Sequence, residues 1–465
     1  MSTSAMISRR KFLSHGCSLG LATATLSTSL LNLGLARRAA AQGAGDYRAL
    51  VCILLAGGND SWNMVVPTDT DQYGQYQAIR SDLALARSQL LPLAGTTATG
   101  RHYGLHPGMP GLQALFASGD AALLCNVGTL LEPVNATMLA SGSALVPLGL
   151  FSHSDQIQQW QTGVSDQRTT TGWGGRVADL LQDVNAANGI SMNISLSGNN
   201  VFQSGASVTE YSIKAEGDGA AGLNAYDDGT EFGAYRKQMI DDLLAVPQQQ
   251  ILRREYRQRL VDAIDSQKLF SAALRQAPVL GTVFGDNPFS QSLRQIARVI
   301  AVRDQLGARR QTFFITVGGW DHHDDVLPNQ AAMLPVISAG LLEFRDALQE
   351  LSVLDAVTTF TTSDFGRTLT SNGKGSDHGW GGHHIIMGGA VNGGSFYGDY
   401  PEIHPDSPLD VGRGIYAPTT SVDEYFAELA RWFGVPASEL TDVLPNLGRF
   451  YSPQSSDLPL GFLRL

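Results

Sequence analysis

An apolar run that leads to an acidic residue occurs three times along this chain. The three runs and their acids are Tyr47–Ala56 with Asp60, Gln311–Val317 with Asp321, and Val357–Thr362 with Asp364. Continuous apolar runs are typical of strands buried on both faces of a parallel sheet. Ligands of α/β proteins bind at the carboxyl ends of such strands. We therefore expect one α/β domain in which the three acids lie at one edge of a single sheet.

Histidines follow the second and third of these acids. His323 lies two positions after Asp321, and a glycine-rich loop after Asp364 carries His378 and His383. Carboxylates and imidazoles this close together are typical of a metal site, and mixed Asp and His donors favour Zn²⁺, Mn²⁺ or Fe over an oxygen-only Ca²⁺ site. We predict one or two divalent-metal sites and expect His378 to reach the same sheet edge as the acids.

The start of a predicted helix over Phe151–Trp160 offers a candidate nucleophile. Ser152 lies at its capping position, where free N–H groups and the positive helix end stabilise an alkoxide or an anion. Its hydroxyl could instead only cap the helix, and His153 and Ser154 are the neighbouring alternatives. Arg367 is the candidate anion-binding cation, with an ion pair to Asp364 as the alternative.

The amino terminus has the features of a twin-arginine export signal. The stretch Ser8–Leu13 reads SRRKFL, a weakly apolar region follows, and Ala39–Ala41 provides a cleavage site. We predict that residues 1–41 are a signal peptide, that the mature chain begins near Gln42, and that the twin-arginine translocase exports it to the periplasm or medium. A membrane anchor is the alternative, but polar residues interrupt the apolar region and leave it too short to span a bilayer.

The net charge of the chain limits which classes of partner it can bind. Residues 42–465 hold 27 basic and 43 acidic residues, a net charge of −16. Such a surface does not suit nucleic acid or anionic lipid, whereas a small anionic ester could bind where a metal supplies positive charge. Cys52 and Cys125 lie in apolar runs and read as two core thiols, with a disulfide as the alternative.

The rest of the chain offers no further candidate site residues. We interpret residues 42–465 as a single domain and residues 190–245 as a peripheral, loop-rich segment. Gly217–Gly222 formally matches G-x-G-x-x-G, but no amphipathic helix follows it, so we interpret it as a loop. The absence of G-x-S-x-G from the sequence argues against a serine α/β-hydrolase.

Several motifs also resemble a known family. The segments GGND, SHSDQIQQWQTG, GGWDHH, SDFGRTLTSNGKGSDHGWGGHH and GGAVNGGSFYGDYP are similar to those of the DUF1501 family of secreted bacterial proteins, which is related to the alkaline phosphatase and sulfatase superfamily. The resemblance implies a three-layer α/β sandwich with a mixed, mostly parallel sheet between helices. It also implies metal-dependent hydrolysis of phosphate or sulfate esters.

The resemblance extends to single positions. Those that resemble the superfamily's metal ligands are Asp60, Asp321, His323, Asp364 and His378, with His383 as a substitute for the last. Ser152 resembles the nucleophile. Phe365 stands where a histidine ligand is expected, which leaves a second metal site open. A catalytically inactive exported protein that binds metal or works with a protein partner is therefore the alternative function.

Overall fold

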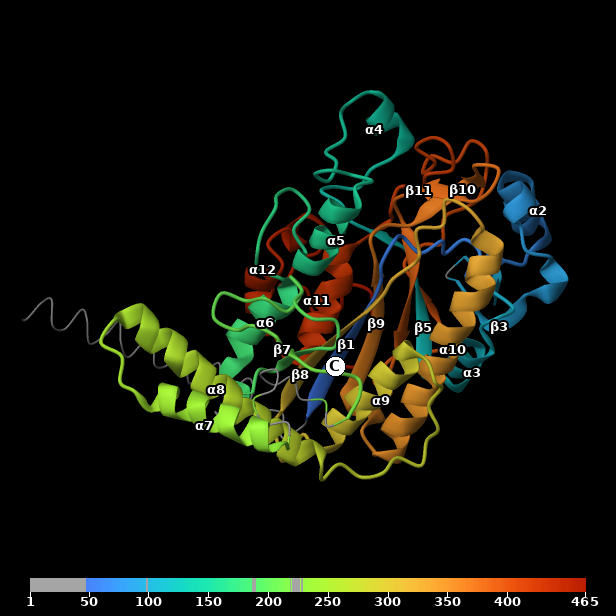
Figure 1. Cartoon of the computed structure of the whole chain (residues 1–465). Coiled ribbons are helices and arrows are strands. Elements are labelled where there is room, and N and C mark those ends of the chain that lie inside the picture. Colours follow the sequence, from blue (N-terminus) through green and yellow to red (C-terminus); the bar gives the residue numbers. More distant parts are fainter. Residues whose placement is uncertain (1–46, 98, 186–189, 218, 220–225, 227–228) are drawn as a thin grey trace, which may run out of the picture. The chain divides into compact units, whose positions relative to one another are not determined.

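A mixed β-sheet forms the centre of the structure (Figure 1). The computed structural model describes residues 47–465 except 98, 186–189, 218, 220–225 and 227–228. The sheet has the strand order β13-β5-β12-β9-β1-β8-β6-β7, and β14 pairs with β5. Its strands are β1 (Arg48–Leu55), β5 (Ala121–Gly128), β6 (Asn193–Ser195), β7 (Tyr211–Ser212), β8 (Arg310–Val317), β9 (Val357–Ser363), β12 (Gly382–Met387), β13 (Phe396–Tyr397) and β14 (Thr420–Ser421).

The pairing in this sheet is mostly parallel. Strand β1 lies between β8 and β9 and is parallel to both, while β12 is antiparallel to its neighbours β9 and β5. Because β1, β8 and β9 are adjacent and parallel, their carboxyl ends meet at one edge of the sheet. This agrees with the prediction made from the acids that follow the three apolar runs. The expected α/β architecture with a mixed, mostly parallel sheet is confirmed.

Side chains on the two faces of β1 belong to different cores. Val51 and Ile53 pack into one core with helices α3 (Pro110–Ser118), α9 (Pro288–Ala301) and α10 (Val326–Glu350). Leu50 and Leu54 pack into the other core with α6 (Trp173–Leu181) and α11 (Val422–Phe433). The period-two alternation of a strand explains this division, since neighbouring residues point to opposite faces. The sheet is therefore covered on both sides, which accounts for the continuous apolar runs.

Helices make up most of the two outer layers (Figure 1). They are α2 (Thr70–Arg80), α3 (Pro110–Ser118), α4 (Ala136–Ala140), α5 (His153–Thr162), α6 (Trp173–Leu181), α7 (Glu231–Ala245), α8 (Ile251–Leu274), α9 (Pro288–Ala301), α10 (Val326–Glu350), α11 (Val422–Phe433) and α12 (Leu440–Val443). The helix α7 corrects the interpretation of residues 190–245 as loop-rich. It begins where the Thr230 side chain accepts a hydrogen bond from the backbone N–H of Gly233.

Two small sheets flank the central one. The first has the order β2-β4-β3, and the second is a pair of antiparallel strands, β10 and β11. Their bounds are β2 (Val65–Pro67), β3 (Leu91–Thr96), β4 (His102–Leu105), β10 (Arg367–Ser371) and β11 (Ser376–His378). In the second pair Arg367 lies directly opposite His378, so both residues reach the same end of the molecule.

The predicted signal peptide at residues 1–41 lies outside the described residues, as does most of Gly217–Gly222. Residues 46–465 form one compact unit. Both Cys52 and Cys125 are buried with free thiols, in agreement with the interpretation as core residues. Among the helices that the structure describes, none is long and apolar enough to cross a bilayer.

Candidate metal site

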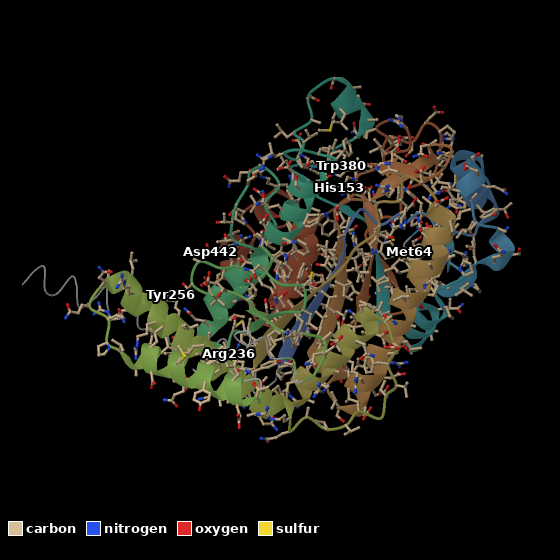
Figure 2. All side chains as sticks on the ribbon, viewed as in Figure 1. Met64, His153, Arg236, Tyr256, Trp380 and Asp442 are labelled. Atoms are coloured by element: carbon tan, nitrogen blue, oxygen red, sulfur yellow. The ribbon has the colours of Figure 1, made fainter. Side chains whose placement is uncertain are left out.

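Four side chains converge beyond the carboxyl ends of the central strands, and we call them the histidine cluster: His153, Asp321, His323 and His378. Asp321 and His323 follow β8, His378 ends β11, and His153 begins α5. Figure 2 labels His153, which lies at the amino-terminal end of α5. The loops after parallel strands and the first turn of a helix are where α/β folds place ligand-binding groups.

The imidazole nitrogens of the cluster surround the carboxylate of Asp321. The Nε2 atoms of His323 and His378 lie 3.1 Å and 3.5 Å from Asp321 Oδ1, and His153 Nε2 lies 3.6 Å from Asp321 Oδ2. The two Nε2 atoms of His323 and His378 are 3.0 Å apart. Ligand atoms of His153, Asp321 and His378 all lie within 4.8 Å of one another.

Each histidine turns its other ring nitrogen, Nδ1, toward an oxygen. The acceptors are Asp364 Oδ2 for His153 at 2.6 Å, the Phe151 carbonyl for His378 at 2.9 Å, and Asp377 Oδ1 for His323 at 3.4 Å. A carbonyl oxygen only accepts, so Nδ1 of His378 carries the proton and its Nε2 keeps a lone pair when the ring is neutral. Carboxylate or carbonyl partners behind the histidines are typical of metal-binding imidazoles, because they fix the tautomer and the ring orientation.

Local backbone and ring packing hold these orientations. Phe151 adopts φ +72°, a left-handed conformation uncommon for an aromatic residue, in the turn that presents its carbonyl to His378. The Phe365 ring lies 4.8 Å from the His153 ring and 4.5 Å from the His378 ring. A Cβ on Gly58, which has φ +87°, would lie 2.6 Å from the Phe365 ring, so only glycine leaves room for it. The residue that replaces an expected histidine therefore supports two other histidines.

Charges around the cluster set its protonation. Burial alone raises the pKa of Asp321, but the hydrogen bond and charge of Arg367, together with His323 and His153, outweigh it and hold this pKa below its usual value. Burial lowers the pKa of His378, against the Phe151 carbonyl, and the charge of Arg367 lowers it further. Near neutral pH the cluster thus combines an ionised Asp321 with a neutral His378, the forms in which both bind metals.

Arg367 lies behind Asp321. Its Nη1 donates to Asp321 Oδ1 at 2.8 Å, and its side chain is fully buried. The structure thus pairs Arg367 with Asp321 and not with Asp364, the alternative considered from the sequence. Its Nε and Nη2 have no hydrogen-bond partner among the described residues, and neither have the ring nitrogens of buried His322.

Asp60, a predicted metal ligand, has a buried arginine as its partner and is not in the group of His153, Asp321 and His378 whose ligand atoms lie within 4.8 Å of one another. Its Oδ2 pairs with Arg80 Nη2 and accepts a hydrogen bond from Ser376 Oγ at 2.6 Å. Both Asp60 and Arg80 are fully buried, and Arg80 also donates to Asn63 and to two backbone carbonyls. The acid after β1 therefore neutralises a buried guanidinium that ties α2 to the loop and hairpin carrying Arg367 and His378.

Two further predicted ligands have other partners. Both oxygens of Asp364 are engaged, Oδ2 with His153 and Oδ1 with the backbone N–H of Gly57 at 3.0 Å, so Asp364 orients a histidine instead of joining the cluster. His383 lies inside the fold, where its Nδ1 accepts from the Asn126 N–H at 3.1 Å and its ring stacks on Tyr400 at 4.4 Å. Of the six predicted ligands, the structure brings Asp321, His323 and His378 together.

His153 is the member of the histidine cluster that the sequence does not indicate, because one histidine at a helix start is no sign of a metal site; from the sequence it is only an alternative to Ser152 as the nucleophile. Ser152 itself precedes α5 and makes no side-chain cap; its Oγ lies 3.1 Å from Ser154 Oγ. Ser152 and His153 are thus neighbours at the start of the helix that borders the cluster.

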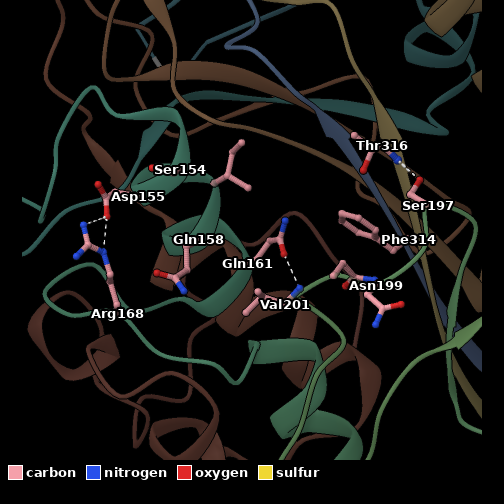
Figure 3. A pocket seen from close by; sticks show the side chains of 12 residues that line it. Ser154, Asp155, Gln158, Gln161, Arg168, Ser197, Asn199, Val201, Phe314 and Thr316 are labelled. Carbon is pink, nitrogen blue, oxygen red and sulfur yellow. Dashed lines mark hydrogen bonds and ion pairs between the residues drawn. The ribbon is translucent and has the colours of Figure 1, made fainter.

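A polar groove runs along α5 (Figure 3). Its volume is about 490 Å³, and its lining comes from one face of α5, the segment around Asn199, and the end of β8. Ser154, the residue after His153, lies in this lining. Gln161 and Asn199 contribute amides, Thr316 a hydroxyl and Phe314 an apolar surface, while Arg168 pairs with Asp155 at one end. A groove with hydroxyl and amide groups over an aromatic ring suits a polar, uncharged organic group.

Comparisons with known proteins identify a family. A family model described as "Protein of unknown function (DUF1501)" matches residues 47–444. None of the curated proteins compared matches the chain.

The solved structures that match this chain do so with low TM-scores. The C-terminal periplasmic domain of EcEptC from Escherichia coli, solved with Zn, is 10% identical, and the match covers 90% of this chain and 93% of that domain with a TM-score of 0.32. The lipoteichoic acid synthase LtaP from Listeria monocytogenes is 9% identical, with coverages of 80% and 76% and a TM-score of 0.32. The PsFucS1 sulfatase from Pseudoalteromonas sp. is 10% identical, with coverages of 86% and 71% and a TM-score of 0.31. These scores support no conclusion about activity.

Proposed function

We propose that this chain, which belongs to the DUF1501 family, binds one divalent metal ion at the histidine cluster and hydrolyses phosphate or sulfate esters there. The observation that carries the proposal is the common orientation of three imidazoles. His153, His323 and His378 all turn Nδ1 to an oxygen acceptor and Nε2 toward the Asp321 carboxylate.

The donor set fits a transition metal. Ligand atoms around a tetrahedral Zn²⁺ at about 2.0–2.1 Å lie about 3.3 Å from one another. The three separations between an Nε2 atom and an Asp321 oxygen, and the one between the Nε2 atoms of His323 and His378, range from 3.0 to 3.6 Å and bracket this value. Three imidazoles and one carboxylate favour Zn²⁺, Mn²⁺ or Fe. With Asp60 paired to Arg80, the described residues support one site instead of two.

Chain residues account for substrate binding. When bound, a divalent ion would polarise an ester oxygen and offset the negative charge of the substrate. Arg367 neutralises Asp321 from behind, so an anionic ester does not meet an uncompensated carboxylate there. Since the polar groove begins one residue after His153, it could receive the organic part of the ester while the anionic group lies at the cluster.

Ser152 remains the candidate nucleophile. It lies next to His153 and before the first turn of α5, whose free N–H groups stabilise negative charge. Its hydroxyl contacts only that of Ser154 among the described side chains, so no described base would take its proton before substrate binds. Attack by water is the alternative.

The second candidate function is metal binding without hydrolysis, in an exported protein that works with a partner. The lack of a base beside Ser152 favours it. Export itself is proposed from the twin-arginine motif Ser8–Leu13, which would send the folded protein to the periplasm or medium through the twin-arginine translocase.

One experiment tests the proposal. The full chain is produced with its own signal, purified from the exported fraction and analysed for metals, then stripped with a chelator and reloaded with Zn²⁺, Mn²⁺ or Fe²⁺. Turnover of p-nitrophenyl phosphate, bis-p-nitrophenyl phosphate and p-nitrophenyl sulfate is measured in each form. We expect one ion per chain, loss of turnover on chelation and recovery on reloading. A metal-loaded protein inactive on every ester would support the second candidate, and a protein that binds no metal would refute both.

A further inference from the structure

We infer that helix α7 pairs, antiparallel, with α7 of a second copy of this chain. Helices α7 and α8 run side by side as a hairpin (Figure 1). Of the fourteen exposed large hydrophobic side chains among the described residues, eight lie between positions 232 and 256. Single exposed hydrophobic residues are ordinary, whereas a contiguous group of this kind marks an interaction surface.

Hydrophobic residues of α7 form one stripe. Phe232, Tyr235, Met239 and Leu243 recur every three or four positions, so they project from one side of the helix, and Val246 follows at its carboxyl-terminal cap. Their side chains are between 50% and 73% exposed. We call these five residues the α7 stripe.

Contact with α8 uses another side of α7. Asp241 and Leu244 face Val261 and Ile264 of α8 across the space between the helices, and Arg257 of α8 donates to the Leu244 carbonyl. Because the α7 stripe does not contribute to this contact, α7 has hydrophobic residues left for a further partner.

The size gradient along the stripe fits a second copy in the antiparallel direction. Its amino-terminal half carries the aromatic Phe232 and Tyr235, and its carboxyl-terminal half carries the smaller Leu243 and Val246. An antiparallel pair centred on Met239 sets Phe232 against Val246 of the partner subunit, and Tyr235 against the partner's Leu243. A two-fold interface needs this kind of self-complementarity, in which one surface matches itself. Parallel pairing would set the two largest side chains against each other.

Charges at the border of the stripe favour the same direction. Arg236 and Asp242 lie three positions before and after Met239, on opposite sides of the stripe centre. Antiparallel pairing places each of these charges at the level of the opposite charge in the other copy, whereas parallel pairing places like charges level. The helix dipoles of two antiparallel α7 helices also attract.

The surface is large enough for a stable pair. Exposed side chains of this size offer on the order of 100 Å² each, so the five of the stripe offer on the order of 500 Å² per copy, or about 1,000 Å² for the pair, the lower limit for a specific interface. Ile251, Leu252 and Tyr256 of α8 are exposed as well; Tyr256 is labelled in Figure 2. An anionic membrane is less suited to α7, because the helix carries Glu231, Asp241 and Asp242 against two basic residues.

Cross-linking tests the register. In the proposed pair Met239 faces its own copy at the two-fold axis, so Met239→Cys should form a disulfide between subunits on mild oxidation in dilute solution. We expect a reducible species of twice the chain mass. Val279→Cys is the matched control, because Val279 is 96% exposed in the loop after α8, and the unsubstituted chain controls for native cysteines. Equally weak cross-linking of both variants would overturn the inference.

A charge at the same position tests the association itself. Sedimentation velocity should show a dimer of the full chain, and Met239→Glu should weaken it more than about tenfold, because two carboxylates would be buried together. Val279→Glu should remain dimeric, and both variants should keep the helical circular dichroism of the parent. A monomeric parent overturns the inference; flotation of that monomer with phosphatidylglycerol vesicles would identify the stripe as lipid-binding instead.

Discussion

The Nε2 atoms of His323 and His378 lie 3.0 Å apart, closer to each other than either lies to Asp321 Oδ1. The Phe151 carbonyl keeps the His378 proton on Nδ1, so the Nε2 atom that faces His323 has a lone pair in the neutral ring. His323 Nδ1 faces the Asp377 carboxylate at 3.4 Å, and with the proton on that nitrogen its Nε2 also has a lone pair. Two lone pairs this close repel, and a cation between them would remove the repulsion. This arrangement supports the proposed metal site.

Removal of one histidine should remove the metal. In His378→Ala, one of four donors is lost, and metal affinity should fall by at least about 100-fold, more than for loss of a residue behind a ligand. Metal content after dialysis measures this. His404→Ala is the matched control, because His404 is exposed and its Nδ1 accepts only from the Asp406 N–H. Equal metal loss in both variants would contradict the assignment.

Asp60 should contribute to stability and not to metal binding. Asp60→Asn leaves the buried Arg80 without its ion-pair partner, and breaking a buried pair lowers the free energy of unfolding by about 3–5 kcal/mol. Urea denaturation should show this loss, while metal content per folded chain stays unchanged. Asp71→Asn, which removes the exposed partner of Arg101, should have no measurable effect. A stable Asp60→Asn protein without metal would restore Asp60 to the ligand set.

The fold could be predicted from local patterns because strands buried on both faces leave a continuous apolar run. The interpretations of Tyr47–Ala56 and Gln311–Val317 as strands agree with β1 and β8 to within one or two residues at each end. Helix α7 could not be found in the same way. Its stripe lies within a segment rich in Gly, Asn and Ser, which we read as loop, and no described part of the fold covers the stripe to reveal its role.

The site was only partly predictable, for a different reason. Asp321 and His323 lie together in sequence, so a local pattern indicates them. His153 joins the cluster through Asp364, 211 positions away, and that contact exists only after the chain has folded. The position of Asp60 after β1 resembles that of a ligand. Its ion-pair partner, Arg80, is buried, and nothing in the sequence indicates that burial.

Ser152 can be separated from the metal ligands by substitution. If Ser152 is the nucleophile, Ser152→Ala should keep the fold and the metal while turnover falls by at least about a thousandfold. Metal content and p-nitrophenyl ester hydrolysis are measured on the same preparation. Ser456→Ala is the control, since Ser456 is exposed and lies outside both the groove and the histidine cluster. Undiminished turnover in Ser152→Ala would indicate attack by water.

Buried histidines on β12 should make the fold sensitive to acid. Burial lowers the pKa of His383 and of His384 to about 3. Because the unfolded chain binds these protons near pH 6.5 and the folded chain does not, stability is complete above pH 6.5 and falls as the pH drops toward 3. Each histidine should cost up to about 2 kcal/mol by pH 5. His384→Gln should reduce the difference between urea midpoints at pH 7 and pH 5; an unchanged difference would contradict this origin.

Buried Asp423 should make the fold less stable as the pH rises, the opposite of the effect of the two histidines. It lies in the first turn of α11, fully buried, and neither carboxylate oxygen has a hydrogen-bond partner among the described residues. Burial, with a smaller effect from Glu424 that outweighs Arg449, raises the pKa of Asp423 to about 8. The folded chain therefore keeps a proton that the unfolded chain releases above its ordinary pKa near 4, so this contribution to stability is complete below pH 4 and is lost as the pH rises to about 8. The loss cannot exceed about 6 kcal/mol.

Asp423→Asn removes the titration, so the free energy of unfolding of the variant minus that of the parent should rise between pH 5 and pH 8 in urea titrations. Asp442→Asn on α12, an exposed site, should follow the parent at both pH values. A variant whose difference from the parent is the same at pH 5 and pH 8 would show that Asp423 is ionised inside the fold.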